Sequence, residues 1–155
     1  MCIRDSNYGA FPTDPYSHTP GFAGAKQPGM TGQVKEEVIA RLQELGVSVV
    51  NGSVTFNPFI LRKSEFLSAP DSLMYFDIHG AQQTQELTAG QLGFTYCQVP
   101  VVYSLAEQTS IVLSFADGRS QTISGNSIDA DLSMRIFDKK GVISKIEVGL
   151  QPGLE

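Results

Sequence analysis

The sequence predicts a mainly β protein, in which a Gly/Pro-rich N-terminal loop and one long amphipathic helix precede an antiparallel β-sandwich. Three observations lead to this fold class. Residues 7–30 are dense in Gly and Pro, residues 31–46 carry a helical apolar stripe, and residues 47–155 form short β-rich runs separated by turn residues. Many short strands with regular turns are typical of antiparallel sandwiches.

The segment 7–30, NYGAFPTDPYSHTPGFAGAKQPGM, has neither helical nor strand periodicity and is predicted to be a loop. Loops of this length are uncommon in compact domains and are usually either functional or disordered. The segment contains Tyr8, Phe11, Tyr16 and Phe22, which is more aromatic content than a disordered linker normally has. We therefore expect it to pack against another part of the protein.

The segment 31–46, TGQVKEEVIARLQELG, is predicted to be an amphipathic helix. Thr31 is a suitable N-cap residue, and Gly46 is a suitable residue to end the helix. Between them, apolar side chains recur at helical spacing: Val34, Val38, Ile39, Leu42 and Leu45.

Short strands are predicted from there to the end of the chain. Asn51-Gly52 between VSVV and SVTF, and Asp117-Gly118 between TSIVLSF and SQTIS, are strong hairpin signals. The other β-rich runs are LMYFDIHG, QTQEL, LGFTYCQVPVVYS and VISKIEVGL. The run IDADLSMRIF suits a helix face through Ile128, Leu132 and Ile136, but it also has strand alternation; we favour a short helix.

Composition excludes several classes of function. The chain has 155 residues, 17% charged residues and a formal net charge of −5, and it has no basic patch or motif typical of nucleic-acid binding. No apolar stretch approaches membrane-spanning length. Cys97 lies in an apolar run and is predicted to be a small, buried hydrophobic residue. The two histidines, His18 and His79, lack an acidic partner motif, so we expect no metal site and no cofactor.

The first residues, MCIRDS, are interpreted as a sequencing-adaptor scar. They reverse-translate to a string that resembles the mosaic-end adaptor of transposase-based libraries, and they have none of the features of a signal peptide. Residues 1–6 are therefore left out of the fold prediction. We expect the rest of the chain to be the C-terminal part of a longer protein.

The order of helix, Asn-Gly hairpin and Asn-Pro resembles a junction in six-hairpin glycosidases. In that family, the last helix of an (α/α)6 barrel leads into a C-terminal β-sandwich. The matching residues are Leu45-Gly46-Val47, the hairpin from Asn51 to Phe56, and Asn57-Pro58. The resemblance implies a loop from the barrel at 7–30, the last barrel helix at 31–46 and the sandwich domain at 47–155. The close resemblance covers only about a third of the chain.

The resemblance also suggests a substrate-binding region. In the phosphorylase branch of the family, a Thr-Gly pair at the start of the last inner helix helps to bind phosphate, and Thr31-Gly32 matches it here. A helix N-terminus favours such ligands. However, Gln33-Val34-Lys35 replaces the family's aromatic residue, so hydrolysis and phosphorolysis both stay open. The candidate substrate-binding residues are His18, Lys26, Gln27, Thr31, Gly32 and Gln33.

Two hypotheses about function follow. The first is the C-terminal part of a carbohydrate-active enzyme, whose partners are a carbohydrate substrate and a missing N-terminal barrel domain. Glycoside cleavage needs two well-placed carboxylates, and no pair here has a suggestive spacing, so no catalytic residue is assigned. The alternative is a stand-alone β-sandwich that binds carbohydrate or protein. Its candidate binding aromatics are Tyr75, Phe94, Tyr96 and Tyr103, although strand alternation places most of them in the core.

Overall fold

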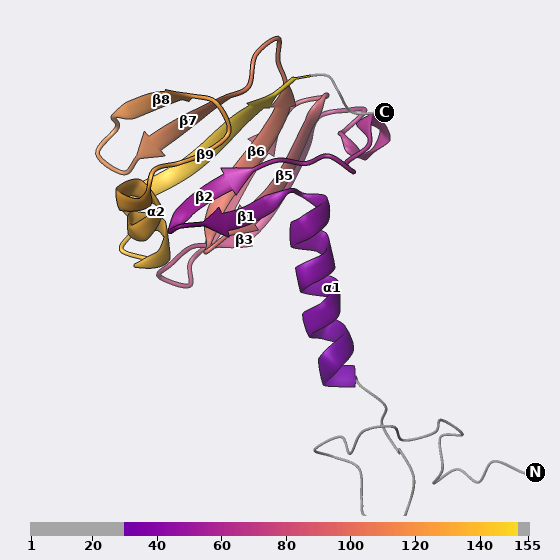
Figure 1. Ribbon diagram of the computed structural model, residues 1–155, viewed down its shortest axis with the longest axis horizontal. Coiled ribbons are helices and arrows are strands. Elements are labelled where there is room, and N and C mark those ends of the chain that lie inside the picture. The colour runs from indigo at the N-terminus through magenta and orange to yellow at the C-terminus, as the bar shows by residue number, and fades with distance from the viewer. Residues whose placement is uncertain (1–29, 152–155) are drawn as a thin grey trace, which may run out of the picture. The chain divides into compact units, whose positions relative to one another are not determined.

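The structure is a computed structural model that describes residues 30–151, with side chains described from residue 37 onward. The segments 1–6 and 7–29 lie outside the described residues, so the adaptor and loop predictions stay predictions. The chain divides into two compact units, residues 1–41 and 42–155. Figure 1 shows the second unit as a β-sheet domain with short hairpins and a short helix. The predicted mainly β fold class is confirmed.

Helix α1 spans Met30–Glu44, close to the predicted 31–46. Because it begins at Met30, Thr31 lies within the first turn and is not the N-cap as predicted. Gly46 has φ 67°, and its N–H donates to the Gln43 carbonyl at 2.9 Å. A left-handed residue just beyond the last turn ends a helix, and glycine adopts this conformation without Cβ strain.

The Asn-Gly hairpin joins β1 (Val47–Val50) to β2 (Ser53–Phe56) as predicted. Asn51 and Gly52 both have positive φ, 51° and 83°, which is the requirement of a type I′ turn. β2 also bonds along its second edge. The N–H of Phe56 donates to the Asn126 carbonyl, and the N–H of Ile128 donates to the Val54 carbonyl, each at 2.8 Å. The hairpin is thereby tied to the segment that precedes helix α2.

The central sheet has five strands in the order β5-β6-β9-β7-β8. Their bounds are β5 Gln91–Tyr96, β6 Val99–Leu105, β7 Ser110–Phe115, β8 Ser120–Ser124 and β9 Ile143–Leu150. β9 lies parallel to β6 and antiparallel to β7, so the sheet is mixed and the prediction of a wholly antiparallel fold is wrong at this pair. The chain makes the β7–β8 hairpin and α2 before β9 returns between β6 and β7. The alternation of apolar and polar residues within one strand does not indicate whether the neighbouring strand is parallel or antiparallel.

The run LGFTYCQVPVVYS, predicted as one β-rich segment, is two strands. Cys97 and Gln98 have φ 50° and 66°, and they form a two-residue turn between β5 and β6. The alternation of side chains along β5 and β6 continues through this two-residue turn without a break. Neither Cys97 nor Gln98 is a Gly or Asn, the residues that normally indicate such a turn. Cys97 is half-buried against the core, and this burial raises the pKa of its thiol, which the nearby Lys139 opposes.

The hydrophobic core lies between one face of the central sheet and the layer formed by β1, β2 and α2 (Figure 1). Tyr103 of β6 is fully buried, with its ring edge-on to Phe56 and Phe94 at centroid distances of 6.1 and 5.0 Å. Its hydroxyl donates to the Leu45 carbonyl at 2.6 Å, so the end of helix α1 is bonded to the sheet. Further core residues are Val54, Leu61, Val101, Ile111, Leu113, Ile128, Leu132, Ile136, Ile146, Val148 and Leu150.

Helix α2 spans Ala130–Phe137, so the ambiguous run is a helix, as we favoured. Asp129 caps it by accepting the Leu132 N–H at 2.8 Å. Leu132 and Ile136 are buried on this helix, and Ile128, which is also buried, lies just before its N-cap. Ser133 on the same helix is also fully buried, and its hydroxyl joins α2 to the hairpin. Its Oγ accepts the Val54 N–H at 2.9 Å and donates to the Ile128 carbonyl at 3.1 Å.

Replacing Ser133 by Ala is expected to lower the free energy of unfolding by about 2–4 kcal/mol, because two buried backbone groups lose their partner. Urea unfolding of both proteins measures the difference. The matched control is Ser144→Ala, since Ser144 Oγ also donates to a backbone carbonyl, that of Ser114 at 3.1 Å, but at an exposed site. Its expected cost is about 0.5 kcal/mol or less. Equal losses in the two variants would contradict the structural role of Ser133.

The opposite face of the sheet is covered at β5 by a second hairpin, formed by β3 (Asp71–Phe76) and β4 (Gln82–Leu87). Gly93 permits the close approach, because a Cβ there would lie 2.7 Å from Leu87 Cδ1. Leu87 of this hairpin and Val102 of β6 are both buried. A short 3₁₀ turn at Lys63–Glu65 precedes it. Within residues 30–151, no helix is long and apolar enough to cross a membrane.

Candidate functional site

The six predicted substrate-binding residues lie at the N-terminal side of the described structure or beyond it. His18, Lys26 and Gln27 fall outside the described residues. Thr31, Gly32 and Gln33 lie in the first turn of α1, where the backbone is described but the side chains are not. The predicted substrate-binding region therefore stays a prediction, and the cavities described below lie within residues 37–151.

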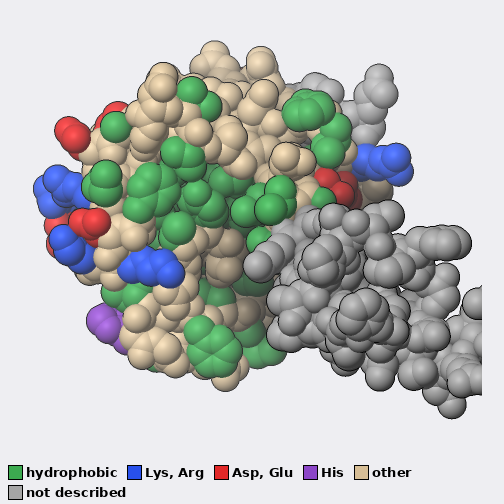
Figure 2. Space-filling view, turned by 60° about the horizontal axis from the view of Figure 1, so that its bottom comes forward, with side chains coloured by type: hydrophobic (Ala, Val, Ile, Leu, Met, Phe, Trp, Pro, Cys, Tyr) green, Lys and Arg blue, Asp and Glu red, His purple; other side chains and the backbone are tan. Residues whose placement is uncertain are grey.

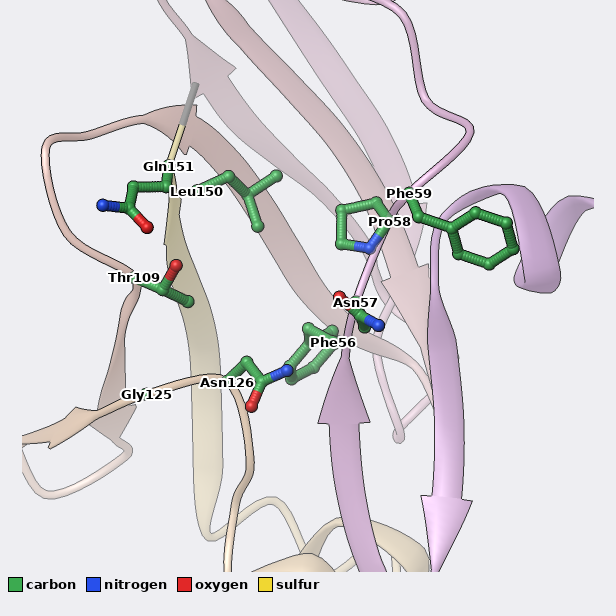
Figure 3. A pocket seen from close by; sticks show the side chains of 9 residues that line it. All are labelled: Phe56, Asn57, Pro58, Phe59, Thr109, Gly125, Asn126, Leu150 and Gln151. Carbon is green, nitrogen blue, oxygen red and sulfur yellow. The ribbon is translucent and has the colours of Figure 1, made fainter. Parts of the chain in front are cut away.

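One candidate within the sheet domain is a cavity of about 430 Å³ at the ends of strands, which we call the strand-end cavity (Figure 3). It lies beside the end of β2, the start of β7 and the ends of β8 and β9. Nine residues line it: Phe56, Asn57, Pro58, Phe59, Thr109, Gly125, Asn126, Leu150 and Gln151. Its volume lies within the range of about 300–1,000 Å³ that is usual for small-molecule sites.

Backbone hydrogen bonds hold the walls of this cavity together. Besides the bond between Phe56 and Asn126, the Gly125 N–H donates to the Thr109 carbonyl at 3.0 Å. Phe56 and Leu150 are buried core residues, so the apolar part of the wall is anchored in the fold. The cavity is thus a product of strand pairing and not of one loop.

The polar side chains of the strand-end cavity have no partner within the described part of the chain. None of the side chains of Asn57, Thr109, Asn126 and Gln151 hydrogen-bonds to another described residue. In Figure 3 the Thr109 side chain points into the space between the two walls, and the Asn126 amide lies beside the Phe56 ring. Amides and hydroxyls both donate and accept hydrogen bonds, so this lining suits a ligand that is rich in hydroxyl groups.

A second cavity of about 250 Å³ lies between the β3–β4 turn and the β5–β6 turn. Its carboxylate, Asp77, is already engaged. Gln83 Nε2 donates to Asp77 Oδ2 at 2.9 Å, and the N–H groups of Ala81 and His79 donate to Oδ1. The hydrogen bond from Gln83, followed by those from the turn backbone, holds the pKa of Asp77 below its usual value. Asp77 therefore organises the hairpin turn, and His79 is an exposed turn residue as predicted.

Three further carboxylates form ion pairs with a residue two positions away in the sequence. Asp117 pairs with Arg119, Asp138 with Lys140, and Glu147 with Lys145. Asp77 is the one carboxylate that lines either of the two cavities. Among the described residues, no group of three or more His, Cys, Asp or Glu side chains is placed to hold a metal ion. Neither cavity has the two facing carboxylates that glycoside cleavage uses.

The aromatic residues named for a stand-alone binding module are mostly core residues. Tyr103 is buried, and Phe94 and Tyr96 are half-buried against the core. Tyr75 is half-buried beside the second cavity. The exposed aromatic side chains of the described structure are instead Phe59 and Phe76, at 77% and 62% exposure.

Sequence reasoning did not single out Thr109, Asn126 or Leu150. These residues come together only through the return of β9 beside β7. The available signal was weak: Gly125-Asn126 follows a predicted strand, and a polar turn pair at such a position is ordinary. Asn57 and Pro58 were noted as part of the family resemblance, but not as part of a site.

Comparison with known proteins does not identify a family for this chain. The chain matches no protein-family model and no curated protein sequence.

Proposed function

We propose that this chain is the C-terminal part of a carbohydrate-active enzyme of the six-hairpin glycosidase type. The sheet domain would stand where the β-sandwich stands in that family and would support the catalytic barrel. Helix α1 would be the last barrel helix, and residues 16–33 would line one wall of the substrate cleft. The catalytic carboxylates would belong to the missing barrel.

The observation that carries this proposal is the junction at Gly46. The Asn57 N–H donates to the Gly46 carbonyl at 2.8 Å, so the helix exit and the Asn-Pro segment are in direct contact. Val47, Phe56 and Pro58 are buried beside this contact. The three segments that carry the family resemblance therefore form one packed unit. Such a unit supports the interpretation that they were selected together as a junction.

Exposed apolar side chains beside this junction agree with a missing partner domain. Leu42 of the helical stripe packs against the core. Phe59 and Ile60, just after Asn57-Pro58, are 77% and 50% exposed. Figure 2 shows hydrophobic side chains gathered in the middle of one face, with acidic and basic side chains near its margin. Patches of this kind typically mark interaction surfaces.

The proposal predicts that the 155-residue chain is catalytically inactive. Purified protein is incubated with aryl glycosides and neutral oligosaccharides, with and without inorganic phosphate. The expected result is product formation no faster than in the blank, because the catalytic carboxylates are proposed to lie in the barrel domain. A known glycosidase serves as the positive control for the substrates. Turnover that co-purifies with the folded chain would contradict the proposed division between the fragment and its barrel.

A further inference from the structure

The strand-end cavity has a chemistry that the proposed enzyme function does not use. Its nine lining residues include amides, a hydroxyl and apolar groups, but none has an ionisable side chain. Burial of an unpaired charge is costly, so such a cavity disfavours anionic and cationic ligands. A neutral ligand with several hydroxyl groups avoids this cost and can use the unengaged polar side chains.

The cavity is lined by both apolar groups and hydrogen-bonding groups, and a pyranose likewise has C–H faces and hydroxyl groups. Leu150 and Pro58 point toward each other from opposite sides in Figure 3, and the Phe56 ring closes the space below them. These groups can pack against the C–H face of a sugar ring. Thr109 and Asn126 lie along the side of β7 and β8, where they can bond to the ring's hydroxyl groups. Sites with mostly apolar walls and a few placed polar groups are usual for small ligands.

From this arrangement we infer that the strand-end cavity binds one saccharide unit of a neutral glycan. Thr109 Oγ1 and the Asn126 amide are its hydrogen-bonding groups, and Pro58 and Leu150 supply apolar contacts from opposite sides. The ring of Phe59 points away from the cavity in Figure 3, so it is not part of this contact. The inference does not rest on the proposed enzyme function, because every residue involved belongs to the sheet domain.

The test uses the whole chain labelled with ¹⁵N and titrated with methyl β-D-glucopyranoside, cellobiose and maltose, with glucuronate as an anionic comparison. We expect saturable amide shifts that centre on Thr109, Gly125 and Asn126 for at least one neutral sugar. Glucuronate is expected to bind at least about tenfold more weakly than that sugar. Shifts centred elsewhere, no saturable shift with any of the neutral sugars, or equal binding of glucuronate would overturn the inference.

Two variants separate binding in this cavity from other contacts. Thr109→Val removes only the hydroxyl, and Asn126→Ala removes the amide while leaving the backbone carbonyl that bonds to Phe56. Each is expected to weaken sugar binding by about five- to tenfold. The matched control is Thr122→Val on the exposed surface of β8, which should bind as the original chain does. Unchanged affinity in both cavity variants, with spectra that show an intact fold, would overturn the assignment of these two residues.

Discussion

Replacing Gly46 by Ala is expected to destabilise the sheet domain by more than about 4 kcal/mol, a loss that single substitutions rarely reach. Two costs add at this position. Gly46 has φ 67°, a conformation that alanine adopts at a cost of about 1–2 kcal/mol. A Cβ would also lie 2.1 Å from the Asn57 carbonyl carbon and 2.2 Å from the Pro58 nitrogen. Because both contacts are with backbone, no side-chain rotation can relieve them.

The matched control for this prediction is Gly118→Ala. Gly118 has φ 84°, but a Cβ at this position would have no heavy atom within 4 Å, so only the backbone cost applies. Thermal and urea unfolding of the two variants should differ by about 3 kcal/mol or more. The Gly46 variant is expected to show a much lower midpoint or no cooperative transition. Similar midpoints would contradict the close packing of the helix exit against Asn57-Pro58.

Replacing Tyr103 by Ala is expected to cost about 3–5 kcal/mol, as is typical when a buried aromatic ring is removed. The ring lies between Phe56 and Phe94, and the substitution would open a cavity in the middle of the core. Tyr103→Phe keeps the ring and removes only the hydrogen bond to the Leu45 carbonyl, for an expected cost of about 1–2 kcal/mol. Urea unfolding measures both losses. Equal losses would show that the hydroxyl, and not the ring, dominates.

The original chain and the Tyr103→Phe variant are also expected to differ in how their stability depends on pH. Burial raises the pKa of the Tyr103 hydroxyl well above its usual value. The folded chain therefore keeps this proton at alkaline pH values at which the unfolded chain, with a tyrosine pKa of about 10, releases it. Stability should fall as pH rises above about 10, and it should fall less steeply in Tyr103→Phe. Tyr75 and Tyr96, whose pKa values burial also raises, are present in both proteins and cancel in the comparison.

Local signals in the sequence predicted those parts of the fold that local chemistry determines. Asn51-Gly52 and Gly46 occupy positions with positive φ, and each was recognised from its residue type. The apolar spacing of Ile128, Leu132 and Ile136 likewise identified helix α2, which buries Leu132 and Ile136, while Ile128 is buried just before it. In each case the signal and the structure lie within a few residues of each other.

Features that depend on distant pairing could not be predicted. The parallel pairing of β6 with β9 joins Val101 to Ile146. Its direction depends on the path of the whole chain between them. The turn at Cys97-Gln98 was missed because tertiary packing imposes a conformation that these residue types do not signal. The strand-end cavity was missed because its lining residues lie at or next to the ends of β2, β7, β8 and β9, which meet only through distant pairing.

Exposed apolar side chains beside Gly46 support the proposed interface with a barrel domain. A complete small domain usually covers its large apolar side chains, yet Phe59 and Ile60 are exposed beside the most tightly constrained glycine of the domain. Exposure at a rigid junction is more informative than exposure on a loop, because the side chains cannot easily withdraw. This combination supports the proposal that a barrel domain docks at this surface.

A long sequencing read across the 5′ side of this gene in its source DNA tests the central proposal most directly. We expect MCIRDS to disappear and the reading frame to continue upstream through repeated amphipathic helix pairs that contain two well-placed carboxylates. The chain would then be the C-terminal part of a larger carbohydrate-active enzyme. An in-frame stop and a ribosome-binding site before a start at Met1 would contradict that proposal and favour a stand-alone binding module.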